Sequence, residues 1–347
     1  MKKRVWKSLG SLLLALALLT GCGRTEETAE SKRYQATFLD LFDTVTTIVG
    51  FAKTEEEFEK AAEMIHGELE RYHQLFDIYN DYEGISNLKT INDQAGIAPV
   101  KTDAKLIRLL KDCQAYEKLT DGKVNAAMGS VLSLWHEARE KGIADPEHAK
   151  LPQKSALQEA AKHCDFDKVV IDEEASTVYI EDPEQTLDVG AIAKGWAAEA
   201  VSQTAPKGYL ISIGGNVCST GAKPDSSGSW VVGIQSPDGE TEEYLHTLYI
   251  TGESVVTSGD YQRYYRVDGT NYHHIIDPET LYPGNLWRAV SVVCEDSGLA
   301  DALSTALFLM SYEEGQELLE QCGAYAMWVT VENEIYYSTG FEELIRT

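Results

Sequence analysis

The feature that most constrains the fold is a change in hydrophobic period near residue 168. Before that point, apolar residues recur every three or four positions over long stretches, which is typical of amphipathic helices. After it, short segments alternate apolar and polar side chains, which is typical of strands with one buried face. Because these strands are joined mostly by short turns, with helices grouped between them, we predict an α+β fold with largely antiparallel sheets.

The same patterns give the expected elements. Helices are predicted over residues 54–77, 103–119, 128–139, 156–163, 191–203, 298–310 and 312–321. Strands are predicted over 38–51, 168–172, 177–181, 209–213, 230–235, 245–251, 254–257, 272–276, 289–293, 325–330 and 335–338. Thr54 and Glu57 have the spacing of a capping box at the start of the first helix. We expect one large domain, or two closely joined lobes, over 35–347.

The N-terminus has the pattern of an export signal that ends at a lipidated cysteine. An apolar run over 12–19 is too short to span a membrane and follows four cations, Lys2, Lys3, Arg4 and Lys7. Small residues then lead to Cys22. We predict a signal peptide over 1–21, a lipid on Cys22 and a flexible tether over 22–34, which would hold the protein on the extracytoplasmic side of the cell membrane. A plain signal peptide with an incidental cysteine is the alternative.

The charge balance excludes one class of partner. The chain has 30 Lys and Arg residues against 56 Asp and Glu residues, a formal net charge of −26 at pH 7. Loss of the signal peptide would remove four cations and leave 26 against 56, or −30. We therefore expect no nucleic-acid partner. A phosphorylated ligand would need a local site where backbone N–H groups, a lysine or a divalent cation make the electrostatic potential positive, against the negative potential of the protein as a whole.

Beyond Cys22, five cysteines are widely spaced and form no CxxC pair. They are Cys113, Cys164, Cys218, Cys294 and Cys322. An odd number of scattered cysteines predicts neither a disulfide framework nor a zinc site. We expect them to be buried free thiols.

Two segments have the chemistry of a phosphate and metal site. Residues 188–197, DVGAIAKGWA, follow a predicted strand and open a helix, whose first N–H groups favour an anion. In ADALSTA, Asp301 and Thr305 are four residues apart, so a carboxylate and a hydroxyl share one helix face and could bind a hard cation. The alternatives are a glycine-bearing turn that only starts a packed helix, and an Asp301 that only stabilises a helix N-terminus.

Three further segments place polar groups at strand ends: ISIGGN over 211–216, TSGDYQRY over 257–264 and HHIIDP over 273–278. Ordinary turn chemistry could explain each of them. A single histidine is more often structural than catalytic, but two beside an Asp-Pro turn make this pair a candidate.

Taken in order, DVGAIAKGWA, SIGGN, SGDYQRYY, HHIIDP and ADALSTA resemble the ApbE family of FAD:protein FMN transferases. The likeness extends from about residue 38 to the C-terminal STGF and includes the lipoprotein start. It implies a T-fold-like α+β arrangement in which one FAD sits in a cleft between lobes. The implied reaction transfers FMN from FAD to a Thr or Ser hydroxyl of an acceptor protein, requires Mg²⁺ and releases AMP.

The resemblance also implies roles for individual residues. The Ala191 carbonyl, Asp301 and Thr305 would bind the metal, and Ser304 occupies a position that is an Asp ligand in some members. His274 is similar to the family's histidine near the reacting phosphate. Positions that match FAD contacts are Phe42, Tyr79, Lys123, Val124, Asn125, Asp188, Lys194 and Ile276. Phe42 stands where many members have Met in a Met-Gly-Thr motif.

The proton of the attacking hydroxyl would pass to His274 or Asp188. Two other activities remain open from the sequence. Water in place of the hydroxyl would make the protein an FAD pyrophosphatase that yields FMN and AMP. A protein of another class, a lipoprotein that binds flavin without catalysis, would use the same residues for affinity alone.

Overall fold

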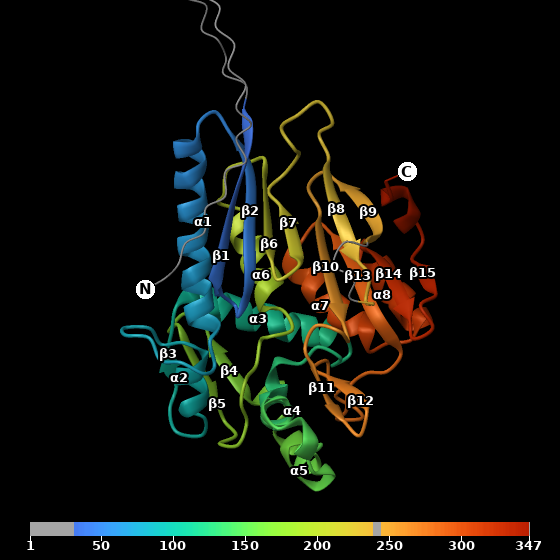
Figure 1. Cartoon of the computed structure of the whole chain (residues 1–347). Helices are drawn as coiled ribbons and strands as arrows, with labels where there is room; N and C mark the ends of the chain where they lie inside the picture. The colour runs from blue at the N-terminus through green and yellow to red at the C-terminus, as the bar shows by residue number, and fades with distance from the viewer. Residues whose placement is uncertain (1–30, 239–243, 347) are drawn as a thin grey trace, which may run out of the picture.

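The computed structural model describes residues 31–238 and 244–346 and is built around one eight-stranded sheet. The strands follow the order β1-β2-β6-β7-β10-β13-β14-β15, and each adjacent pair is antiparallel (Figure 1). Their bounds are Lys32–Leu41, Thr44–Ala52, Tyr209–Ile213, Asn216–Ser219, Ser254–Gly259, Trp287–Cys294, Tyr325–Thr330 and Ile335–Tyr337 in that order. The sheet therefore joins the first strands of the chain to the last.

Both faces of the sheet are covered, because neighbouring strand residues point to opposite sides. Ile48 and Val292 lie in a core beneath the helices, whereas the next residues, Val49 and Val293, lie in a second core. The first core packs against α1 (Glu55–Phe76), α6 (Ala193–Ser202), α7 (Ser297–Phe308) and α8 (Tyr312–Cys322). The second packs against a ribbon formed by β8 (Trp230–Gln235) and β9 (Tyr244–Ile250).

A smaller lobe lies below the sheet in Figure 1. Its three-stranded sheet has the order β3-β5-β4, and a ribbon of β11 and β12 lies beside it. The strands are β3 (Val100–Lys101), β4 (Val169–Asp172), β5 (Thr177–Ile180), β11 (Tyr264–Val267) and β12 (Thr270–His273). The helices are α2 (Leu88–Asp93), α3 (Ala104–Leu119), α4 (Gly129–Ala144) and α5 (Lys154–Ala160). Loops from this lobe and from the large sheet meet at one site.

The first strand differs from its predicted form. Residues 38–51 were expected to make one strand, but they form the β1–β2 hairpin, in which Leu41 pairs with Thr44. Phe42 and Asp43 are the two turn residues, with φ of 52° and 51°. Both angles lie in the left-handed region that a two-residue type I′ turn requires. Neither residue is glycine, so the turn gave no clear signal in the sequence.

The predicted α+β class with largely antiparallel sheets is confirmed. The structure adds α2, β3, β7 and β11, which were not predicted; α2 lies in a stretch that its polar composition indicated to be a loop. Strand β12 ends at His273 rather than at residue 276. The predicted signal peptide and Cys22 lie outside the described residues. Strand β1 begins at Lys32, so the last residues of the predicted tether already belong to the sheet. Within the described residues, no helix is both long and apolar enough to cross a membrane.

Candidate active site

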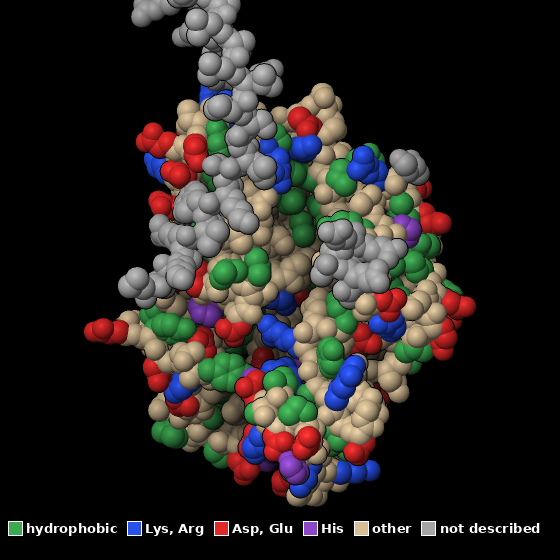
Figure 2. Space-filling model, viewed as in Figure 1, with side chains coloured by type: hydrophobic (Ala, Val, Ile, Leu, Met, Phe, Trp, Pro, Cys, Tyr) green, Lys and Arg blue, Asp and Glu red, His purple; other side chains and the backbone are tan. Residues whose placement is uncertain are grey.

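A cavity of about 1430 Å³ lies where the large sheet meets the smaller lobe. Figure 2 shows it as a hollow in the middle of the visible face, with Lys or Arg side chains on its floor. Every predicted site residue that the structure describes lines this cavity: Phe42, Tyr79, Lys123, Val124, Asn125, Asp188, Ala191, Lys194, His274, Ile276, Asp301 and Thr305. Residues from widely separated parts of the chain therefore meet, as the resemblance implied.

The starts of α6 and α7 form one wall and hold Asp301 rigidly. The Asp301 side chain is buried, and its Oδ2 accepts a hydrogen bond of 2.8 Å from the Gly195 backbone N–H. Lys194 Nζ lies 3.6 Å from the same oxygen. A Cβ on Gly195 would lie 2.5 Å from Asp301 Cβ and would collide with the Ser297 carbonyl oxygen, so only glycine permits this helix contact.

The bond from Gly195 to Asp301 also frees a carbonyl. In a regular helix start, the Gly195 N–H would donate to the carbonyl four residues earlier, that of Ala191. The next residue does follow that rule, since Trp196 N–H donates to the Ile192 carbonyl at 2.9 Å. Within the described residues, the Ala191 carbonyl therefore accepts no backbone hydrogen bond. It remains available to a ligand at the cavity.

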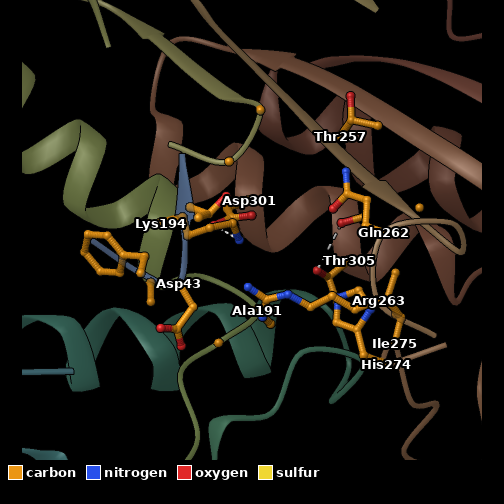
Figure 3. Close-up of a pocket in the computed structure, with 18 of the residues that line it drawn as sticks. Asp43, Ala191, Lys194, Thr257, Gln262, Arg263, His274, Ile275, Asp301 and Thr305 are labelled. Carbon is orange, nitrogen blue, oxygen red and sulfur yellow. Dashed lines mark hydrogen bonds and ion pairs between the residues drawn. The ribbon is translucent and has the colours of Figure 1, made fainter. Parts of the chain in front are cut away.

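Thr305 completes a set of three oxygen donors on this wall, together with the Ala191 carbonyl and Asp301 (Figure 3). Carboxylate, hydroxyl and carbonyl oxygens suit a hard cation such as Mg²⁺, which commonly takes only one or two carboxylates and fills its other positions with water and phosphate. The described residues contain no group of three His, Cys, Asp or Glu side chains that could hold a metal. The oxygen donors of this set suit a hard cation.

Ser304 has a structural role in the same helix. Its side chain is fully buried, its Oγ donates to the Asp301 carbonyl at 2.9 Å, and it lies 2.8 Å from Ser258 Oγ. Ser258 Oγ is also 3.5 Å from Thr305 Oγ1. Ser258, near the end of β10, thus links Ser304 and Thr305 on α7 and helps to orient Thr305.

The two histidines of HHIIDP have different environments. His273 is buried, with its Nε2 2.7 Å from the Gly284 carbonyl and its Nδ1 accepting from the Ile275 N–H at 3.2 Å. His274 lines the cavity, and its buried Nδ1 has no hydrogen-bond partner among the described residues. Burial lowers the pKa of His274 to about 3, and the positive charge of Arg263 contributes. His273 is therefore structural, whereas His274 carries a neutral imidazole into the cavity.

Asp188 lies just before α6, where its Oδ1 accepts from the Gly190 N–H at 2.8 Å. Burial raises the pKa of this carboxyl group, and the hydrogen bond from Gly190 opposes that shift. Tyr79, on the loop after α1, keeps 56% of its surface exposed and stacks at 30° against the His136 ring, 5.3 Å away. An exposed ring beside a cavity can stack on a planar ligand.

The segment 123–125 lines the cavity, but its polar groups already bond to the protein. Lys123 Nζ contacts Glu279 at 2.6 Å and Asp277 at 3.3 Å. The Asn125 side chain donates to the Cys164 carbonyl at 2.9 Å and accepts from the Ala127 N–H at 2.7 Å. These side chains shape the wall. Ile276 supplies apolar surface to the same cavity and is 6% exposed.

The β1–β2 turn reaches the cavity from the other lobe. Phe42 N–H donates to His73 Nδ1 at 3.2 Å, and the two rings meet edge to face at 5.5 Å. This contact presents the Asp43 side chain to the cavity, as Figure 3 shows. Phe42 therefore supports the turn through His73, and its neighbour Asp43 is a lining residue that the sequence did not identify.

Other lining residues were also missed: His136, Arg139, Gln262 and Arg263. The first two are three residues apart on α4, and Arg139 Nη2 lies 2.8 Å from His136 Nδ1. Gln262 and Arg263 belong to the TSGDYQRY segment. The sequence marks this segment as a candidate but singles out no residue within it. Their spacing carried no signal, because the turn that presents them depends on contacts far away in the sequence.

Comparison with known proteins identifies the family of this chain. Residues 42–328 match the model of the ApbE family. The chain belongs to this family. An FAD:protein FMN transferase of Treponema pallidum is 30% identical, over 99% of this chain and 96% of its own length. One of Klebsiella pneumoniae is 32% identical, over 81% of this chain and 85% of its own. The family resemblance stated from the motifs is thus confirmed.

Solved structures of the ApbE family share the fold. The ApbE protein of Thermotoga maritima superimposes with a TM-score of 0.80 at 29% identity, covering 91% of this chain and 100% of its own. The flavin transferase ApbE of Vibrio cholerae has a TM-score of 0.74 at 23% identity, over 90% and 99%. The predicted ApbE-like arrangement is confirmed, and the curated relatives are transferases by name.

Proposed function

We propose that this ApbE-family protein transfers FMN from FAD to a Thr or Ser hydroxyl of an acceptor protein, with Mg²⁺ bound and AMP released. The observation that carries the proposal is the convergence of three oxygen donors, from Ala191, Asp301 and Thr305, beside the Lys194 ammonium in one cavity. The names of the family's curated members support the choice of FAD and FMN.

The reaction replaces the phosphoanhydride bond of FAD with a phosphoester bond to the acceptor. The acceptor oxygen forms a bond to the FMN phosphorus while the bond from that phosphorus to the bridging oxygen breaks, and the bridging oxygen leaves with AMP. A magnesium ion held by the three oxygen donors would neutralise charge on the pyrophosphate. Lys194 supplies a further positive charge on the same wall.

His274 is the group that we propose to accept the proton of the attacking hydroxyl. Its Nδ1 is unpaired among the described residues, and its depressed pKa keeps the imidazole neutral at pH 7. The negative charge of a bound pyrophosphate would raise that pKa and so strengthen the base when substrate is present. Asp188 is the second candidate, although one of its carboxylate oxygens already accepts from Gly190.

The flavin would occupy the part of the cavity lined by Tyr79, Val124 and Ile276. An exposed phenol ring and two apolar side chains suit a planar, aromatic ligand. Lys123 and Asn125 hold this wall through their own hydrogen bonds, and we assign them to its shape. Phe42 acts in the same way from the β1–β2 turn.

We also propose that a lipid on Cys22 anchors the enzyme to the extracytoplasmic side of the cell membrane. The support is the order of cations, apolar run and small residues before Cys22. Acceptors would then be exported or membrane redox proteins. Replacing Cys22 by Ala tests the anchor: the variant should move from the membrane fraction to the soluble extract, while its catalytic activity with FAD is unchanged.

The activity is tested with FAD, Mg²⁺ and a candidate acceptor protein that contains Thr or Ser. Mass spectrometry should show covalent FMN on the acceptor, and one AMP should form for each adduct. Steady AMP release without acceptor would identify an FAD pyrophosphatase. Tight FAD binding with no AMP under either condition would leave only a flavin-binding lipoprotein and would falsify the transferase.

A further inference from the structure

Four Lys or Arg side chains line the cavity: Lys123, Arg139, Lys194 and Arg263. Three of them contact partners within the protein. Lys123 contacts Glu279 and Asp277, Lys194 contacts Asp301, and Arg139 contacts His136. For Arg263, the described residues provide neither a carboxylate within 4.0 Å nor a hydrogen-bond acceptor. It is therefore the lining cation without a direct protein partner among the described residues, although its charge also acts on the Asp188 carboxyl group in the same cavity.

The local fold aims Arg263 into the cavity. The chain turns between the end of β10 at Gly259 and the start of β11 at Tyr264. The Tyr261 ring packs so closely against Gly259 that a Cβ there would overlap it, and Asp260 N–H donates to the Arg288 carbonyl at 3.0 Å. These contacts fix the turn, and Figure 3 shows the Arg263 side chain extending across the cavity.

Strand pairing places Arg263 beside the proposed base. Tyr264 pairs with His273 at the end of the β11–β12 ribbon, so the next residues outward on the two strands are Arg263 and His274. The positive charge of Arg263 contributes to the low pKa of His274, which agrees with this proximity. In Figure 3 the two residues enter from the side opposite Lys194 and Asp301, and the Arg263 side chain reaches across the cavity toward Ala191.

A cation at this position has a clear use in an acidic protein. The chain carries a net charge of −26, so a ligand with two phosphate charges needs local positive groups. A guanidinium has five N–H donors in a fixed plane, a geometry that matches phosphate oxygens. The oxygen donors on the α6–α7 wall need a metal ion to reach a phosphate, whereas Arg263 can contact phosphate directly.

We propose that Arg263 binds the pyrophosphate of FAD through its guanidinium N–H groups, on the side of the cavity opposite Asp301. This inference rests on the proposed function for the identity of the ligand. It assigns to Arg263 both affinity for the phosphates and stabilisation of charge on the phosphate under attack. It also explains why a cation lies beside His274 with no carboxylate in direct contact among the described residues.

The experiment compares Arg263→Gln and Arg263→Lys with the wild-type enzyme in the presence of Mg²⁺, using two probes. FAD contains the pyrophosphate, whereas riboflavin contains the same ring without phosphate. Loss of a charge-assisted hydrogen bond should weaken FAD binding by about 10- to 100-fold in Arg263→Gln. Riboflavin affinity should be unchanged, and Arg263→Lys should restore part of the FAD affinity because it keeps the charge.

Arg266→Gln is the matched control, because Arg266 is exposed on β11 and its Nε donates to Asn271 outside the cavity. It should bind FAD like the wild type. Wild-type FAD affinity in Arg263→Gln would overturn the inference, and so would an equal loss of riboflavin and FAD affinity, which would indicate a structural role. Wild-type FMN transfer is measured in parallel, so failure of the proposed function is seen separately from failure of the Arg263 contact.

Discussion

On the α6–α7 wall of the cavity, the key polar groups are held by the protein, whereas on the opposite wall two groups lack partners among the described residues. Asp301 is buried and bonded to Gly195 and Lys194. Across the cavity, the His274 Nδ1 and the Arg263 guanidinium make no hydrogen bond to the described residues. The first wall is organised before a ligand arrives, whereas on the second the Arg263 side chain lines the cavity without a direct partner among the described residues and the unpaired His274 Nδ1 is buried.

This difference predicts different consequences for substitutions on the two walls. Changes on the α6–α7 wall should disturb both structure and chemistry, because helix packing and metal ligands share the same atoms. Changes at Arg263 and His274, beside the β11–β12 ribbon, should affect binding or rate while leaving the fold intact. Substitutions on each wall of the cavity can test this difference, and the largest effect is expected at Asp301.

Asp301→Asn should lower the rate of FMN transfer by about 10³-fold, since an amide provides less charge for a divalent cation at the same position. The rate is measured by single-turnover AMP release at saturating FAD. Asp296→Asn is the control on the same helix: Asp296 caps α7 by accepting from Leu299 N–H at 2.9 Å and does not line the cavity. Full transfer activity in Asp301→Asn would remove Asp301 from the metal site.

His274→Gln should slow transfer by about 100-fold, within the range for loss of a general base. The affinity for FAD should change only a few-fold, because the imidazole is assigned to the acceptor hydroxyl rather than to the flavin. His273→Gln should behave differently and destabilise the fold, since both nitrogens of His273 make hydrogen bonds within the protein. If His274→Gln transfers FMN at the wild-type rate, Asp188 becomes the candidate base.

Gly195→Ala should lower the free energy of unfolding by about 1–3 kcal/mol, because its methyl group would push α6 away from α7. Transfer should fall with it, since the Gly195 N–H orients Asp301. Urea unfolding followed by circular dichroism measures the first effect. Gly67→Ala on α1 is the matched control: a Cβ there meets nothing within 4 Å, so it should be neutral or stabilising by up to about 1 kcal/mol.

Local periodicity was enough to predict that two of the candidate residues lie on one helix face. Asp301 and Thr305 share a face because they are four residues apart on a helix, and the structure places both at the cavity. The free carbonyl of Ala191 could not be derived in this way. It depends on a hydrogen bond between Gly195 and Asp301, which are 106 residues apart, and only the family resemblance indicated it.

The opposite wall was less visible in the sequence. Strand β11 was not predicted, so nothing showed that Arg263 and His274 would be neighbours across a ribbon. The β1–β2 turn could not be predicted from the sequence. Phe42 and Asp43 adopt left-handed backbone angles there, and neither is glycine, the residue that usually indicates such a turn. For Arg263 and His274, the sequence does not show the strand pairing that brings them together. For the β1–β2 turn, it does not show the backbone angles of the two turn residues.

The smallest predicted effect concerns pH and tests the environment of His274. Its pKa is about 3 in the folded protein against an ordinary value of 6.5, first because of burial and then because of Arg263. Between these values the unfolded chain binds a proton that the folded protein does not, so this histidine makes stability rise with pH. Its contribution is present above pH 6.5 and is lost as the pH falls towards 3.

Urea midpoints at pH 7.5 and pH 5 measure the effect for the wild type, His274→Gln and Arg263→Gln. The wild type should lose more stability on acidification than His274→Gln, because glutamine binds no proton in either state. Arg263→Gln should fall between them, since removal of the neighbouring charge raises the folded pKa of His274 towards its ordinary value. Equal losses in all three proteins would mean that His274 is protonated as easily in the fold as in the unfolded chain, and the contrast between the two walls would lose its electrostatic basis.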